Sequence, residues 1–282
     1  MPAPRIVLAN VDRPPDTASL VPCTDAETAG AIECVRETLL ARRKSASARP
    51  DDGLTARLRR LRNPLLSGYR YGSCVLLSEP FNAIPSAIMR SSEQVARAAA
   101  RSLFGPGPPA SLVCALSAFG DAALRAAIAG GVRIAIVPEA RRYAEFSPLV
   151  AGRVPGIDDW SAPPAGLFVV EERTILLRNH TMGMTAAHEF AHALDAVMAK
   201  RPRSYYSYES EELRGYFATA SGFVNEYAAS GLDEFFAESM RAYLEVNDAR
   251  CAWLPLTRQD LFLRDPRMFK LVERLFSNGF EV

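Results

Sequence analysis

Apolar positions recur at helical spacing through the C-terminal third of the chain. They predict four helices, over about 183–200, 209–221, 231–246 and 266–277. Just before the first of them, the segment GLFVVEERTILLRN at 166–179 has the apolar runs of two short strands around a charged turn. This arrangement predicts an α+β fold, with a small sheet and a helical C-terminal half.

The N-terminal part of the chain carries weaker patterns. Helices are predicted there over about 25–43, 54–65 and 91–104. The third begins at Ser91 or Ser92, either of which can act as its N-cap. Arginines lie between the leucines of the second helix, where they form a solvated basic face or a docking surface for an acidic partner. Residues 1–24 are rich in Pro, Asp and Thr and are expected to form a loose lead-in.

The run GPGPP at 105–109 is the strongest break in the chain. We expect a domain boundary there, between a mainly helical N-terminal region (1–105) of undefined role and a second domain (106–282). A helix near 121–129 and a strand at 132–138 are predicted early in the second domain.

The composition of the chain limits the kinds of binding partner and the cellular locations that we expect for the protein. The formal net charge is +1, which gives no global reason to expect a nucleic acid or a membrane surface as partner. The five cysteines are scattered and none forms a C-x-x-C pair, which argues against a disulfide framework and favours a reducing compartment. The beginning of the sequence lacks the features of a signal peptide, and no stretch has the apolar length of a membrane helix. We expect a cytoplasmic protein, or an effector exported without a cleaved signal; oligomeric state is left undefined.

One short motif carries the candidate chemistry. The segment AAHEFAHALDAV contains His188 and His192 four positions apart, which places both imidazoles on one face of a helix. Glu189 lies beside that face and can act on a water without taking a ligand position. Zinc lowers the pKa of a water that it binds, and a neighbouring carboxylate can then accept the proton. The pattern therefore predicts a catalytic Zn²⁺ site, with Glu189 as general base.

The histidines also have an alternative, purely structural interpretation. His188 and His192 could instead be a satisfied pair in a buried helix, since apolar residues at helical spacing surround them. The chain has only three histidines and two fall in this motif, which favours metal binding. The third, His180, is expected to be an ordinary loop histidine.

A catalytic zinc site of this type needs a third protein ligand. Asp195 is close in sequence, but its angle on the helix drifts away from the face of the two histidines. The later segment DEFFAESMRAYLE offers Glu234 and Glu238, four apart on one face of an amphipathic helix. One carboxylate can bind the metal while the other accepts the free N–H of a ligand histidine.

These residues resemble a known family. The segments HEFAHALD and EYAASGLDEFFAE are similar to those of zinc metallopeptidases of the anthrax lethal factor type, a gluzincin-like group that includes Pro-Pro endopeptidases and the Mlc titration factor. Glu234 follows His188 by 46 positions, and Tyr227 precedes Glu234 by seven, as the family pattern requires. The resemblance covers roughly 165–282 and does not extend to 1–105.

The resemblance implies a zincin-like catalytic domain with one catalytic Zn²⁺. Its ligands would be His188, His192 and Glu234, with Glu189 as general base. Tyr227 would donate a hydrogen bond to the oxyanion or the leaving group. The remaining implied residues have supporting roles: Glu238 is the acid behind a ligand histidine, and Asp195 supports the helix or a neighbouring loop. An edge strand within 168–177 would hold an extended peptide by main-chain hydrogen bonds.

Three functions remain open on these grounds. The first is an endopeptidase that cuts a limited set of protein or peptide substrates bound in extended form. The second is an aminopeptidase, for which the acidic run Glu209, Glu211 and Glu212 is a candidate site for the substrate amine; a solvated helix start explains these residues equally well. The third is a non-catalytic protein that keeps the zinc fold and sequesters a partner. In the segment YYSYESEE at 205–212, the tyrosines are expected to line a substrate groove, to form a lid, or to be partly exposed loop aromatics.

Overall fold

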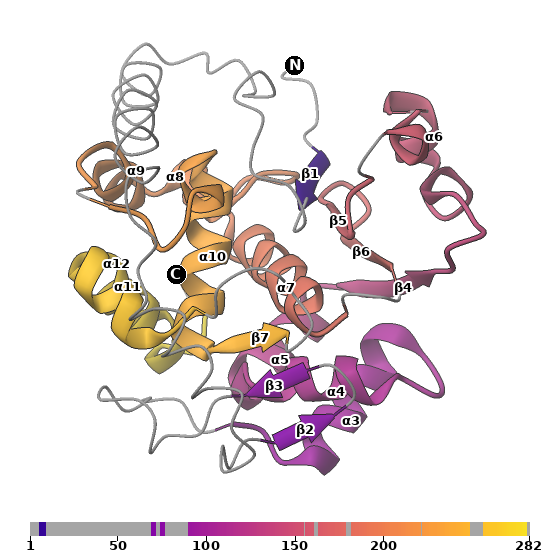
Figure 1. The fold of residues 1–282 in the computed structure, drawn as a ribbon, viewed down its shortest axis with the longest axis horizontal. Coiled ribbons are helices and arrows are strands. Elements are labelled where there is room, and N and C mark those ends of the chain that lie inside the picture. The colour runs from indigo at the N-terminus through magenta and orange to yellow at the C-terminus, as the bar shows by residue number, and fades with distance from the viewer. Residues whose placement is uncertain are drawn as a thin grey trace, which may run out of the picture.

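The computed structural model describes residues 6–9, 69–71, 74–76, 90–154, 156–160, 163–178, 182–220, 222–248 and 256–280. Helices and strands are mixed in these residues, which confirms the predicted α+β class (Figure 1). The helices predicted over 25–43 and 54–65, and the loop histidine His180, lie outside the described residues.

A four-stranded sheet forms one layer of the fold. Its strand order is β1 (Ile6–Ala9), β5 (Gly166–Val169), β6 (Thr174–Arg178) and β4 (Arg133–Val137). The strands β4 and β6 are parallel, while β5 runs antiparallel to both β6 and β1. The predicted strand at 132–138 and the two strands within 166–179 are confirmed. The loose lead-in expected over 1–24 is wrong at Ile6–Ala9, because these residues pair with β5.

The sheet is covered on both faces, which explains why every residue of β5 and β6 is buried. Side chains alternate between the two faces. Phe168 and Ile175 belong to the main core beside α7 (Met182–Met198). Leu167 and Leu176 face a smaller apolar cluster on the other side. Three short elements contribute to that cluster: η3 (Tyr143–Glu145), α6 (Pro148–Arg153) and η4 (Ile157–Asp159).

Two helices at the centre of the molecule position the candidate site. These are α7 and α10 (Leu232–Leu244), which pack against each other. Every residue of α10 is buried, so that both of its faces meet protein. Asp233 and Glu234 lie in its first turn and Arg241 in its last, as the helix dipole favours. The helix ends at Glu245, which adopts a left-handed conformation with φ 57°. The helices predicted over 183–200 and 231–246 are therefore confirmed, with small shifts at the ends.

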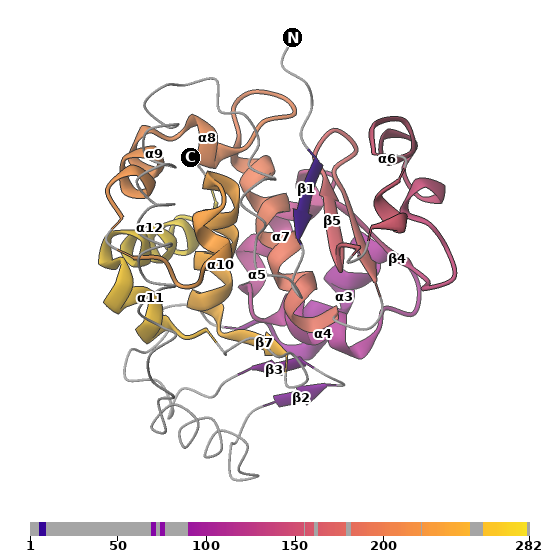
Figure 2. The same cartoon turned by 45° about the horizontal axis from the view of Figure 1, so that its top comes forward.

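Three helices drawn in magenta in Figure 2 form a group beside α7, in which the second and third contact α7 and the first packs on the other two. They are α3 (Glu93–Phe104), α4 (Ala110–Ser117) and α5 (Gly120–Ala129). Ser92 caps α3 as predicted, since its Oγ accepts from the backbone N–H of Val95 at 3.3 Å. The run Gly105–Pro109 joins α3 to α4, and both helices contribute to the core that contains α7.

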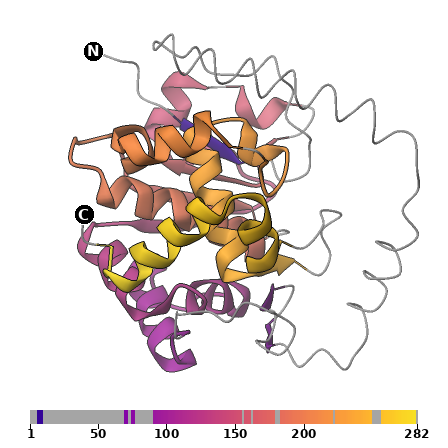
Figure 3. The same ribbon diagram turned by 90° about the vertical axis from the view of Figure 1, so that its left-hand side faces the viewer.

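A second, three-stranded sheet lies at the edge of the fold. It consists of β2 (Tyr69–Tyr71), β3 (Cys74–Leu76) and β7 (Val246–Asp248), all antiparallel. The orange and yellow helices beside α10 are visible in Figure 3: α8 (Tyr206–Glu209), α9 (Glu211–Ala218), α11 (Arg258–Arg264) and α12 (Pro266–Ser277). The helix predicted over 266–277 is confirmed at both ends, and the one predicted over 209–221 appears as α9.

Among the described residues, no single helix is long and apolar enough to cross a membrane. Only when α4 and α5 are taken together do they have the length and apolar composition of a membrane-spanning helix, and the chain bends by 110° between them. Both helices pack against α3, and both contribute to the main core.

Candidate metal centre

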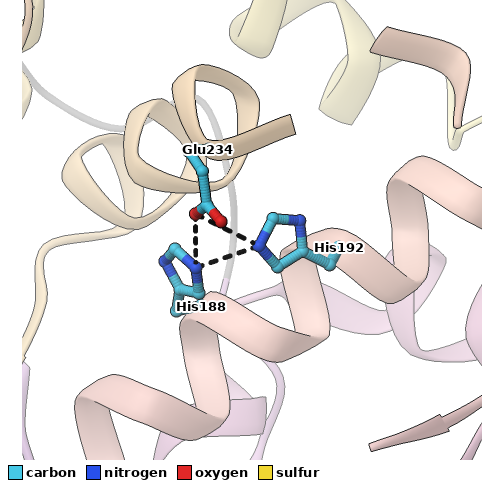
Figure 4. A group of neighbouring side chains, drawn as sticks. All are labelled: His188, His192 and Glu234. Atoms are coloured by element: carbon cyan, nitrogen blue, oxygen red, sulfur yellow. Dashed lines mark hydrogen bonds and ion pairs between the residues drawn. The ribbon is translucent and has the colours of Figure 1, made fainter. Parts of the chain in front are cut away.

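Three side chains from two helices converge at one point (Figure 4). His188 and His192 come from successive turns of α7, and Glu234 comes from the first turn of α10. The Nε2 atoms of the two histidines are 2.9 Å apart. Oε2 of Glu234 lies 3.0 Å from the Nε2 of His188 and 3.4 Å from the Nε2 of His192. The three residues predicted as metal ligands therefore form one buried group that could hold a metal ion.

The donor set fits a zinc-type cation. Tetrahedral N and O ligands at about 2.0–2.1 Å from zinc stand about 3.3–3.4 Å from one another. The three distances in this group, 2.9, 3.0 and 3.4 Å, fall within a few tenths of an ångström of that spacing. A single proton between two of these atoms accounts for only one of the contacts, whereas a cation accounts for all three. The structure thus supports a metal site here without fixing which metal binds.

Glu238 holds His188 from behind. Its Oε1 lies 2.7 Å from Nδ1 of His188, the ring nitrogen that faces away from the other ligands. Glu238 also accepts hydrogen bonds from Arg241, at 2.7 Å to Oε2, and from the side-chain amide of Asn225. These contacts keep Glu238 ionised, so Nδ1 of His188 carries the proton and Nε2 presents a lone pair to the site.

The cluster is electrostatically balanced around His188. Burial lowers the pKa of its imidazole, but the carboxylates of Glu234 and Glu238 outweigh burial and raise that pKa to about 10. For Glu234 the directions are reversed. Burial alone would raise the pKa of its carboxyl, but the neighbouring histidines outweigh burial and lower that pKa to about 2. The pocket therefore favours one positive charge between two carboxylates, which a bound cation can supply in place of a proton.

Glu189 lies beside the ligand group and is fully buried, with 0% of its surface exposed. Burial raises the pKa of its carboxyl to about 8. Neither carboxylate oxygen has a hydrogen-bond partner among the described residues, and the backbone N–H of Phe168 lies toward it without reaching hydrogen-bond geometry. A buried carboxyl with free oxygens and a raised pKa is suited to accept and return a proton near neutral pH.

Gly166, the first residue of β5, makes room for Glu189. A Cβ atom at this position would lie 2.6 Å from Cγ2 of Thr185 and 2.9 Å from Cγ of Glu189. Real carbon contacts of that length do not occur, so only glycine allows β5 to approach α7 this closely. The sheet is thereby held against the turn of α7 that carries the candidate base.

Tyr227 lies at the other side of Glu234. It opens the short helix η6 (Tyr227–Ala229), and its hydroxyl donates to Oε1 of Glu234 at 3.0 Å. Burial and the charge of Glu234 raise the pKa of Tyr227 well above its ordinary value, so the phenol keeps its proton. Its ring centroid is 5.6 Å from that of His188. The phenol is therefore a proton-bearing donor next to the candidate metal ligands.

Asp195 is not part of the ligand group. Its two carboxylate oxygens accept from the backbone N–H and the hydroxyl of Ser207, at 2.7 and 2.6 Å. Because Asp195 lies on α7 and Ser207 on α8, the carboxylate fastens the two helices together. In this position Asp195 supports the junction of the two helices and does not face the ligand group.

The segment 205–212 packs against the metal-site helices. Tyr205 is buried, with its ring centroid 6.2 Å from that of His192. Tyr208 donates its hydroxyl to Asp233 at 2.6 Å, so the segment is anchored to α10. Glu209 accepts from the backbone of Lys200 and Arg201, and Glu212 binds Arg274 at 2.5 Å. Two of the acidic residues considered as an amine-binding site therefore already pair with groups of the chain itself.

Sequence reasoning missed several supporting residues. Arg241 lies three positions after Glu238 on the same helix, a spacing that could have suggested the pair. Asn225 has no such signal: its amide reaches Glu238 while its Oδ1 accepts from Ala228 in the turn that carries Tyr227. The close approach of Gly166 to α7 depends on sheet geometry and also leaves no local pattern.

No protein-family model matches the chain, and a comparison with curated proteins finds no match either.

Proposed function

We propose that this chain is a zinc-dependent endopeptidase with a zincin-like catalytic domain, acting on a limited set of protein or peptide substrates. The observation that carries the proposal is the buried group of His188, His192 and Glu234, with the unpartnered carboxylate of Glu189 beside it. A structural zinc site takes four protein ligands, whereas three leave a position open for chemistry.

Each residue then has a defined part in peptide hydrolysis. A zinc ion bound by the three ligands would supply Lewis acidity and lower the pKa of a water molecule. Glu189 accepts a proton as the water attacks, and it returns the proton to the leaving amine. Tyr227, which keeps its proton, donates a hydrogen bond to the oxygen that becomes negative in the tetrahedral state. Glu238 keeps His188 in the tautomer that binds metal.

The experiment combines metal analysis with cleavage of a peptide library. Purified wild type is expected to hold about one zinc per chain and to cut a subset of peptides. Glu234→Ala should lose the metal, because two histidines alone bind zinc weakly. Glu189→Gln should keep the metal and lose activity by about 10²–10⁴-fold, the usual contribution of a general base.

The control is Glu273→Gln on α12, a glutamate outside the site, which should match the wild type in both assays. Wild type that binds no zinc when prepared without chelator would contradict the proposal. Zinc binding with no cleavage in any form would favour the sequestering function instead. Release of single N-terminal residues only would favour an aminopeptidase.

A further inference from the structure

The strand β1 lies where an added peptide strand would lie. It pairs antiparallel with β5, with Ala9 opposite Gly166, Leu8 opposite Leu167 and Val7 opposite Phe168. On its other edge β5 pairs with β6, so β1 takes the only edge of β5 that remains in the described sheet. The expected edge strand within 168–177 is therefore not an edge in this structure, because the chain itself covers it.

This edge is the one beside the candidate catalytic residues. Gly166 of β5 lies against Glu189, since a Cβ atom at this glycine would be 2.9 Å from Cγ of Glu189, and its partner in β1 is Ala9. The strand β1 also contacts α7, the helix that carries both histidines (Figure 2). A segment paired with β5 thus runs past the metal helix at the level of Glu189.

The catalytic group is closed in this arrangement. His192 and Glu189 have no exposed surface, and His188 is 2% exposed. An endopeptidase must bring the middle of a long chain to these atoms, and an extended chain can be held there by main-chain hydrogen bonds to β5. Because β1 already makes this pairing, a substrate and β1 compete for the same row of N–H and C=O groups.

We propose that the segment Ile6–Ala9 is a built-in occupant of the peptide-binding edge of β5, and that an extended peptide must displace it to reach the metal centre. This inference rests on the proposed function for the identity of the competing peptide, but the pairing itself does not. Its consequence is a latent enzyme that opens when β1 leaves β5.

Tethering makes the internal strand a strong competitor. A segment on the same chain has an effective concentration on the order of millimolar even when its intrinsic affinity is modest. A free peptide of similar affinity must therefore approach that concentration to replace it. Weakening β1 should lower the concentration that is required.

The test uses the full chain with a paired substitution in β1. In an antiparallel ladder, alternate residues donate to the neighbouring strand, so Val7→Pro with Leu8→Pro removes a ladder donor whichever residue faces β5. The matched control is Val7→Ile with Leu8→Val, which keeps both N–H groups and places a β-branched residue that favours strands at both positions. Wild type, proline variant and control are all prepared zinc-loaded in a Glu189→Gln background, which prevents cleavage of the probe.

The probe is a fluorescent peptide with the sequence of residues 3–12, APRIVLANVD, and binding is read by anisotropy. We expect the proline variant to bind it at least tenfold more tightly than wild type, and the control to behave as wild type. Equal binding by the folded wild type and proline variant would overturn the inference, as would no binding by a folded proline variant.

Hydrogen exchange on the unsubstituted chain gives an independent test in case the proline variant does not fold. A heavy-isotope copy of the same peptide is added at millimolar concentration. We expect the amides of β1 to lose protection while those of β5 keep it, because the added strand replaces the internal one. Unchanged protection of β1 would overturn the inference.

Cleavage assays separate this inference from the proposed function. With Glu189 restored, the proline variant should cut library peptides at least tenfold faster than wild type. If the proline variant binds the peptide more tightly than wild type and no form cleaves any peptide, the endopeptidase is rejected and the occupied edge is kept. Cleavage at equal rates by wild type and proline variant would reject the occupied edge while keeping the endopeptidase.

Discussion

Nδ1 of His188 and Oε1 of Glu238 lie 2.7 Å apart, on two helices that are far separated in the sequence. The carboxylate sets which ring nitrogen carries the proton, and so it decides whether Nε2 can bind a cation. Arg241 and Asn225 in turn hold Glu238 in place. The candidate metal centre thus consists of a histidine that could bind a metal ion, a carboxylate that accepts from its other ring nitrogen, and two donors that hold the carboxylate.

Glu238→Gln should weaken metal affinity by about 10–100-fold, the usual effect of removing an outer hydrogen-bond acceptor from a ligand histidine. The amide keeps the shape of the side chain but is neutral, so it no longer selects the proton on Nδ1 or pairs with Arg241. Competition with a zinc-chelating dye measures the change. An unchanged affinity in a folded variant would show that Glu238 does not set the tautomer of His188.

Tyr227→Phe should lower kcat by about 10²–10³-fold, with KM and zinc content unchanged, because it removes one hydrogen-bond donor to the developing negative charge. The matched control is Tyr216→Phe, which removes a hydroxyl bound to Glu212 at 2.7 Å on the surface. Peptide-cleavage kinetics and metal analysis on both variants check this. Loss of zinc in Tyr227→Phe would instead assign the phenol to support of Glu234.

Gly166→Ala should destabilise the fold by about 1–3 kcal/mol, the usual cost of overpacking. The added methyl would meet Thr185 and Glu189 at distances that no real contact reaches, so either β5 or α7 must shift. The matched control is Gly215→Ala on α9, where a Cβ meets nothing within 4 Å. That change should stabilise the helix by about 0.4–1 kcal/mol. Urea unfolding measures both, and equal effects would contradict the close approach of β5 to α7.

Asp195→Asn should change how stability depends on pH. Burial raises the pKa of Asp195 from 3.8 to about 7, although the bonds from Ser207 lower it. The folded state therefore keeps a proton that the unfolded state releases, and this contribution to stability is present below about pH 4 and is lost as the pH rises toward 7. Each pKa unit corresponds to about 1.4 kcal/mol, so the wild type should lose on the order of a few kcal/mol relative to the variant across this range.

Urea unfolding with chelator present, from pH 4 to pH 7, measures the difference between the two proteins. The difference in unfolding free energy should shift in favour of Asp195→Asn as the pH rises. Parallel curves for wild type and variant would show that Asp195 ionises normally in the folded state.

The sequence predicted the helices that carry the metal ligands, because their apolar residues recur with the helical period. It did not predict α4, whose sequence ASLVCALS is almost continuously apolar and has no side-chain cap. A segment buried on all sides shows no period. The strands β1 and β7 were also missed, since they have only four and three residues and gain their stability from distant partners.

In the candidate site, too, local features could be predicted from the sequence and contacts between distant segments could not. His188 and His192 share a helix face, which is a local property, and the position of Glu234 was expected from family spacing. The contacts of Asn225 and Gly166 could not be predicted from local pattern, because each joins elements whose relative placement depends on tertiary packing. The pairing of β1 with the edge of β5 was missed because the sequence pattern of a strand does not specify which other segment will pair with it.

The three-stranded sheet of β2, β3 and β7 has a consequence for the speed of folding. The helix α10 leads directly into β7, and Asn247 of β7 pairs with Val75 of β3, a residue from the early part of the chain. Contacts between residues so distant in sequence form slowly, because closing the large loop between them costs chain entropy before the contacts contribute any favourable free energy. We therefore expect the end of α10 away from Glu234 to be fixed late in folding. In refolding experiments we therefore expect zinc to enter its site at the rate of this slow closure, whatever the zinc concentration.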